Sequence, residues 1–277
     1  MKTGRAELKA RARQCLKGNF GVAAGGILLY YGISWLLSSA MQIVTMIGSG
    51  SSTIFSVLTS GTDDLAAMGS FMTDSKPILI VMIALMIIMY LVTMVVMYLL
   101  VPGLIRMHMN ICNGQKANVG DLFWAFRNRP VKFAGIGVLI LLAMMVLMIP
   151  LWILIAAAVV SGDTKFLAVF MVIYMAVLMV VMAWWYLNFA MFYYILVEDP
   201  EKGIIEALKE SHQLMKGNRC RYLVMGLSWL GWEIFALASF GIGYLWILPY
   251  IYCTSVYFYQ DLKPQVETIP PERSWDF

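Results

Sequence analysis

Residues 131–160 read VKFAGIGVLILLAMMVLMIPLWILIAAAVV, and no side chain from Phe133 to Val160 is charged. A helix rises about 1.5 Å per residue, so about 20 apolar residues cross a hydrocarbon core about 30 Å thick. Backbone groups inside lipid find no water, which leaves helices and closed barrels as spanning structures. An unbroken apolar run lacks the alternation of a barrel strand. This stretch therefore predicts a transmembrane α-helix.

Five more apolar runs accompany it along the chain. The six runs are residues 20–47, 78–105, 131–160, 166–197, 222–240 and 244–259. Apolar residues make up 61% of the 277 positions and charged residues only 13%, with a mean hydropathy of +0.77. A soluble domain is nearer half apolar and a quarter charged, so lipid must solvate most of this chain. We predict an all-α fold: one integral membrane domain over residues 1–277, built as a bundle of six transmembrane helices.

The basic residues indicate how these spans are oriented. All but two of the 20 Lys and Arg residues lie in the N-terminal segment, in the connections after the second and fourth runs, or in the C-terminal tail. The exceptions are Lys76 and Lys165, on the other side. Because cytoplasmic connections are enriched in Lys and Arg, we predict that the basic side is cytoplasmic and holds both termini. The net charge of +4 follows this topology, so no nucleic-acid partner is expected.

Each basic segment also shows helical periodicity ahead of an apolar hairpin. Spacings of three and four residues place the apolar positions of each segment on one helix face. We predict three amphipathic interfacial helices that lie in the headgroup layer with these faces toward lipid. The faces are Leu8, Ala12, Cys15 and Leu16; Val119, Leu122, Phe123 and Phe126; and Ile204, Ile205, Leu208 and Met215. For the third helix, Asp199 is the predicted N-cap and Pro200 the first helical residue.

A repeat relates these segments. The series Gln14, Lys17, Gly18 and Asn19 matches Gln213, Lys216, Gly217 and Asn218 at a constant offset. We predict a threefold repeat with units 1–110, 118–198 and 199–262. The alternative is chance similarity between short basic helices.

The cations of the interfacial helices are the predicted contacts with anionic lipid or with a protein partner. They could instead serve only to anchor the topology. These residues are Lys9, Arg11, Arg13, Lys17, Arg127, Arg129, Lys216, Arg219 and Arg221.

Glu233 is the ionisable side chain deepest in a predicted span. A charge at the bilayer centre is costly, so we expect this carboxyl to face the bundle and to be protonated or partnered. Asn188, at a similar depth in the fourth span, is the candidate partner. The pair is interpreted either as a proton or substrate site or as a hydrogen bond that locks two helices.

Catalytic and metal-binding patterns are missing from the sequence. No His-Glu-x-x-His, nucleophile elbow, Walker motif or Rossmann fingerprint occurs, so we expect no enzyme and no cofactor. The cysteines at positions 15, 112, 220 and 253 show no metal-ligand spacing with His108 or His212, and we expect reduced thiols without a metal site. The 48–77 connection, rich in Ser, Thr and Gly, is predicted to be a flexible external loop.

A family resemblance covers nearly the whole chain and is most specific from Tyr194 to Leu262. The ordered series of residues that carries it includes Asp199, Pro200, Ser211, Gly217, Trp232, Gly241, Gly243, Pro249 and Tyr250. This series, together with the segment around residues 12–19, resembles a bacterial integral membrane family called domain-of-unknown-function family 975. The resemblance implies a six-helix bundle in the bacterial plasma membrane and no assigned activity. A looser similarity to the membrane domain of some glycerophosphodiester phosphodiesterases carries no activity over, because no phosphodiesterase domain is present.

Two hypotheses for function follow. The first is a non-enzymatic membrane component whose basic interfacial helices bind anionic lipid or a protein partner. The second is a small transporter or export accessory with a polar site around Glu233 and Asn188. Internal repeats occur in transporters, but these repeats all start on the same side and suit scaffolds equally well.

Overall fold

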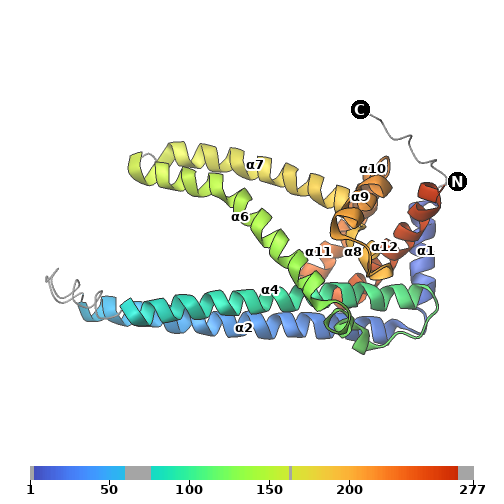
Figure 1. Cartoon of the computed structure of the whole chain (residues 1–277), viewed down its shortest axis with the longest axis horizontal. Coiled ribbons are helices and arrows are strands. Elements are labelled where there is room, and N and C mark those ends of the chain that lie inside the picture. Colours follow the sequence, from blue (N-terminus) through green and yellow to red (C-terminus); the bar gives the residue numbers. More distant parts are fainter. Residues whose placement is uncertain (1–2, 60–75, 162–163, 268–277) are drawn as a thin grey trace. The chain divides into compact units, whose positions relative to one another are not determined.

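The computed structural model describes residues 3–59, 76–161 and 164–267, and every regular element in these ranges is a helix (Figure 1). Contacts divide the chain into two compact units, residues 29–98 and the remainder. The elements are α1 (Arg5–Leu16), α2 (Phe20–Thr59), α4 (Lys76–Cys112), the 3-10 helix η1 (Val119–Phe123), α5 (Trp124–Arg127), α6 (Pro130–Ser161), α7 (Thr164–Phe189), α8 (Phe192–Glu198), α9 (Ile204–Met215), α10 (Arg219–Leu227), α11 (Leu230–Ala238) and α12 (Tyr244–Glu267).

Within the described ranges, four segments are long and apolar enough to cross a membrane. They are Phe20–Met46, Ile83–Cys112, Pro130–Ala157 and Val169–Glu198, which correspond to the first four expected runs. Large apolar side chains point outward along them; Val172 and Met179, for example, are 71% and 70% exposed. Such surface is stable only against lipid. The protein is therefore an all-α, multi-pass membrane protein.

The unit formed by residues 29–98 holds most of α2 and the first part of α4. Here α2 continues to Thr59, so residues 48–59 are helical and not part of a flexible loop as expected. A long helix extends itself because each further residue adds a backbone hydrogen bond, even where Ser and Gly have weak helix propensity. The rest of that expected loop, residues 60–75, lies outside the described residues.

The last two expected runs, residues 222–240 and 244–259, form a hairpin whose first arm is interrupted. Residues 222–240 do not make one helix, because the chain breaks at Ser228 between α10 and α11, each of nine residues. At the break Trp229 N–H bonds the Gly226 carbonyl, three residues back, and the Ser228 hydroxyl bonds the Met225 carbonyl. A nine-residue helix is about 14 Å long, less than half of the hydrocarbon core. Over the described residues the structure thus shows four candidate spans, and six spans are not shown.

The expected repeat has a counterpart in the local backbone. Helices α1 and α9 both have 12 residues, and both end at a lysine, Lys17 or Lys216, with φ of −62°. The next residue is left-handed in each case: Gly18 has φ of 88° and Gly217 has φ of 77°. After α5 the left-handed position belongs to Arg129, with φ of 54°. A short helix, a left-handed residue and a further helix thus recur three times.

Each short helix packs against a longer segment. Helix α1 lies beside α12, and α9 lies against α7 and α8. The η1 turn approaches α4 so closely that a Cβ added at Gly103 would sit 2.0 Å from the Leu122 carbonyl oxygen. The first short helix, α1, therefore covers the last hairpin, formed by α10, α11 and α12. The second, η1 with α5, covers the end of α4, and the third, α9, covers the end of α7. Each short helix thus packs on the hairpin that comes before it, and the first packs on the last, which gives a closed cyclic order. Figure 1 also shows α1 crosswise to the start of α2.

This packing corrects the expected orientation of the interfacial helices. Leu8, Ala12 and Leu16 of α1 are buried against the protein and not in lipid. In α9 the buried face is Ala207, Ser211, Leu214 and Met215, while Ile205 is 69% exposed. In the second segment Leu122 and Ala125 are buried, whereas Phe123 and Phe126 are exposed. The buried face of α1 is the expected one, but the buried faces of α9 and of the second segment differ from those expected, because periodicity alone does not say which side finds a protein partner.

Candidate functional site

A cavity of 340 Å³ opens where α1, the start of α2 and α12 meet. Arg13 and Lys17 border it with two cations, and Trp246 and Tyr250 border it with two aromatic rings. The Arg13 guanidinium carbon lies 5.8 Å from the centroid of the Tyr250 ring. Leu16, Gly18 and Phe20 complete the lining.

Local sequence places both cations at this point. The last turn of α1 leaves carbonyl groups without helical partners, and the negative end of the helix dipole favours Arg13 and Lys17 there. Gly18, in the left-handed region, then turns the chain so that α2 begins at Phe20, the first residue of a candidate span. The cavity therefore lies at the end of a membrane-crossing segment, where lipid headgroups are found.

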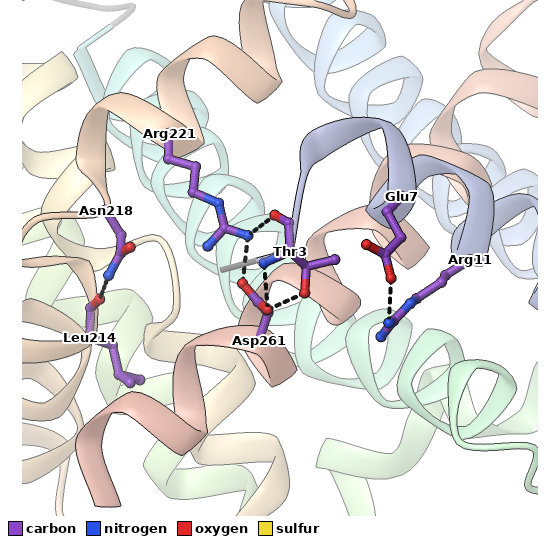
Figure 2. A network of polar contacts seen from close by, with 7 residues as sticks. All are labelled: Thr3, Glu7, Arg11, Leu214, Asn218, Arg221 and Asp261. Atoms are coloured by element: carbon purple, nitrogen blue, oxygen red, sulfur yellow. Dashed lines mark hydrogen bonds and ion pairs between the residues drawn. The ribbon is translucent and has the colours of Figure 1, made fainter. Parts of the chain in front are cut away.

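A polar network holds the N-terminal end of α1, whose other end borders the cavity (Figure 2). Asp261 of α12 accepts hydrogen bonds from the Thr3 amide (3.2 Å) and the Thr3 hydroxyl (2.5 Å). Arg221 of α10 donates to the same carboxylate at 2.5 Å and to the Thr3 carbonyl. Burial opposes the charge of Asp261, but the hydrogen bonds from Thr3 and Arg221 outweigh it and hold the pKa of this carboxyl below its ordinary value. The beginning of α1 is thus tied to both arms of the third hairpin.

Lys9 forms a second tie. Its ammonium group lies 3.8 Å from the centroid of the Trp229 ring and donates to the Ser228 carbonyl at 3.3 Å. That carbonyl belongs to the break between α10 and α11, where it lacks a partner within its own helix. Burial, with a contribution from Arg5, lowers the pKa of Lys9. This lysine, expected to contact lipid or a partner, therefore contacts the protein itself.

The other cations expected at the interface divide into three groups: paired, half-buried and exposed. Arg129 pairs with Glu201, Arg11 pairs with Glu7 at 2.6 Å, and Arg221 is part of the Asp261 network. Arg219 is half-buried. Four cations are exposed on the surface: Arg13, Lys17, Arg127 and Lys216. Of the nine, only Arg13 and Lys17 line the cavity described above.

Glu233 lies half-buried in a separate cavity of 270 Å³ between α7, α10, α11 and α12. Its polar neighbours in the lining are Tyr186, Tyr222 and Ser255, and the two tyrosine hydroxyls lie 3.2 Å apart. Asn188 does not line this cavity. Its side-chain amide donates to the Trp184 carbonyl at 2.6 Å, and its main-chain carbonyl accepts from the Ser211 hydroxyl. Sequence reasoning missed the tyrosines and Ser255, although Ser255 stands out as a polar residue in an apolar run.

The residues of the family series serve turns and close packing. Asp199 ends α8 and accepts from the Glu201 amide at 3.1 Å, whereas α9 begins after Gly203, so Asp199 is not the N-cap that we expected. The Pro200 carbonyl accepts from Lys132. Gly241 is left-handed with φ of 86°. A Cβ on Gly243 would lie 2.7 Å from Ala236 Cα, which explains a glycine there. Trp232 is largely exposed, and Pro249 is buried.

Comparison with known proteins gives one positive result. No curated protein and no solved structure matches the chain. The model of a family described as "Protein of unknown function (DUF975)" matches residues 1–265, nearly the full length. The chain, whose described residues form four candidate membrane spans and the docked short helices, belongs to this family.

Proposed function

We propose that the protein is a non-enzymatic component of the bacterial plasma membrane that binds anionic phospholipid headgroups at the cavity between α1, α2 and α12. The observation that carries this proposal is the position of Arg13 and Lys17 together at the end of the Phe20–Met46 span. Two cations that border an otherwise apolar lining match the charge and the amphipathic character of a phospholipid.

The aromatic residues support the same occupant. Trp246 is 58% exposed, and Tyr250 faces the Arg13 guanidinium. Tryptophan and tyrosine favour the headgroup level of a membrane, because their rings are apolar and carry a polar group. The buried apolar face of α1 is occupied by α12, so binding relies on the exposed cations and not on insertion of this helix into lipid.

Lipid retention in detergent tests the proposal. The purified protein is supplied with equal amounts of phosphatidylglycerol and phosphatidylcholine, and bound lipid is counted by native mass spectrometry. Each basic residue near an anionic surface contributes about 1 kcal/mol, so the double variant Arg13→Gln/Lys17→Gln should lose about 30-fold in affinity for phosphatidylglycerol.

The matched control is Arg11→Gln, which removes the same charge from the same helix but lies outside the cavity. This variant should keep most of the preference for phosphatidylglycerol. Equal loss in the control and the double variant, or no preference in the unaltered protein, would refute a site at the cavity.

For the topology, we propose that both termini lie in the cytoplasm and that the third hairpin, residues 219–259, enters the membrane from that side without a full crossing. Lys17 and Trp246 line one cavity, so the first turns of α12 lie beside the start of the first span. Exposed apolar side chains such as Phe235 and Phe240 nevertheless require lipid contact. The alternative is the six-span topology, in which Ile242 reaches the external side.

Labelling at this turn separates the two topologies. Ile242→Cys is placed in a background without the four native cysteines, and a membrane-impermeant thiol reagent is added to intact cells. Protection in intact cells is the expected result for the shallow hairpin. Labelling there would establish six spans.

A small transporter or export accessory is the second candidate function, and the cavity at Glu233 favours it. This cavity gathers a carboxyl, two tyrosine hydroxyls and Ser255 among apolar residues. Glu233→Cys, tested with the same reagent on vesicles of both orientations, reports on a water path. Labelling from either side would support transport, and complete protection in the folded protein would assign Glu233 to helix packing.

A further inference from the structure

Three cysteines far apart in the sequence converge in the structure. Cys15 belongs to α1, Cys112 is the last residue of α4, and Cys253 lies on α12. Their sulfur atoms all lie within 4.8 Å of one another, and those of Cys15 and Cys112 are 3.6 Å apart. Cys253 is buried, and the other two are half-buried.

These distances resemble those of a thiolate metal site before the ion enters. Zn–S bonds are about 2.3 Å, so two thiolates on one tetrahedral ion lie roughly 3.8 Å apart. The cluster therefore needs a contraction of less than about 1 Å to hold an ion at that bond length. A disulfide would need two sulfur atoms at about 2.05 Å, and all four described cysteines are free thiols.

The surroundings hold the three donors in place. The Tyr257 hydroxyl donates to the Cys112 carbonyl at 3.2 Å, and Gln260 donates to Asn113 at 2.7 Å, so α12 is tied to the end of α4. The Cys15 thiol lies 3.2 Å from the Ala12 carbonyl, within its own helix.

We propose that Cys15, Cys112 and Cys253 bind a thiophilic metal ion of the class of Zn²⁺ or Cu⁺ through three thiolates. Soft sulfur ligands select such ions over Mg²⁺ or Ca²⁺. His108 lies one turn before Cys112 but outside the sulfur cluster, so the donor set is three sulfurs. The ion clips α1 to α12 and to the end of α4, three elements that otherwise meet through packing and polar contacts.

Metal titration of the reduced, purified protein tests this site. Zn²⁺ and Cu⁺ are added separately without oxygen, unbound ion is removed, and metal per chain is measured by elemental analysis. One equivalent of at least one ion should remain, and its affinity should fall at least tenfold in Cys15→Ser, Cys112→Ser and Cys253→Ser. Cys220→Ser is the matched control, because Cys220 is exposed and outside the cluster, and it should bind like the unaltered protein.

A second measurement needs no variant and so does not depend on how the serine proteins fold. The unaltered protein is alkylated with N-ethylmaleimide with and without the bound ion, and modified peptides are identified by mass spectrometry. The ion should protect the half-buried Cys15 and Cys112 and leave Cys220 reactive, whereas Cys253 is buried and should not react in either state. Retention of neither ion by the reduced protein, equal loss in Cys220→Ser, or protection that includes Cys220 would overturn the proposal.

Discussion

Replacing Asp261 by Asn should loosen α1 from α12 without disturbing the membrane spans. The carboxylate accepts two hydrogen bonds from Thr3 and one from Arg221, and the side chains of Arg221 and Asp261 are only 20% and 13% exposed. A hydrogen bond to a charged group contributes about 1.5–3 kcal/mol when it is shielded from water. The amide keeps one acceptor but loses the charge, so we expect a loss of about 2 kcal/mol, or about 30-fold in the opening equilibrium of α1.

Hydrogen exchange of the α1 amides measures this opening. The matched control is Glu7→Gln, which removes an acidic charge from an ion pair with Arg11 whose side chains are 55% and 53% exposed. Exposed pairs of this kind contribute about 0–1 kcal/mol, so exchange should change by a few-fold at most. If Asp261→Asn accelerates exchange no more than Glu7→Gln does, the network does not hold α1, and the reasoning fails.

Acid should act on the same network. The folded pKa of Asp261 is below its ordinary value of 3.8, so its contribution to stability is complete above that pH and is lost as pH falls through the folded value. Thermal unfolding followed by tryptophan fluorescence should therefore show a drop in midpoint below about pH 4. The part of this drop due to Asp261 should be missing in Asp261→Asn, and an identical acid profile would exclude this carboxyl as its source.

Three further substitutions test the packing of the short helices. Gly103→Ala places a methyl group against the Leu122 carbonyl and should lower the unfolding midpoint by several degrees, whereas Gly135→Ala, with no atom within 4 Å of the new Cβ, should not lower it. Gly217→Ala puts a side chain at φ of 77°, which costs about 1–2 kcal/mol, and a midpoint equal to that of the unaltered protein would contradict this. Lys9→Met removes the cation above the Trp229 ring and its hydrogen bond to the Ser228 carbonyl, so a loss of about 1 kcal/mol in unfolding free energy is expected. An unchanged value in denaturant titration would count against a structural role for Lys9.

The long apolar runs made the membrane helices predictable. Residues 133–160 carry no charge, so nothing in their sequence competes with a spanning helix. Backbone hydrogen bonding in lipid leaves a single local solution there, which needs no knowledge of distant residues. The left-handed glycines after α1 and α9 also depend on local sequence alone, since Gly18 and Gly217 follow helices of matching sequence.

The candidate site depended on contacts that no local pattern reveals. Lys9 looks like any interfacial lysine until α1 lies beside α12, where Trp229 and the Ser228 carbonyl receive it. The cysteines at positions 15, 112 and 253 showed no ligand spacing, because each comes from a different helix. The break at Ser228 was hidden as well, since the run around it is apolar enough for one span.

The cyclic order of the short helices has a consequence for biosynthesis. Thr3 binds Asp261 across 258 residues, so the first helix made by the ribosome docks on the last. At about 5–20 residues per second, α1 waits roughly 13–50 s for its site to be synthesised. During that time its apolar face has no protein partner and must rest on lipid or on a chaperone. A chain that stops before α12 keeps this face uncovered, which gives the cell's quality-control proteases a direct signal that the protein is incomplete.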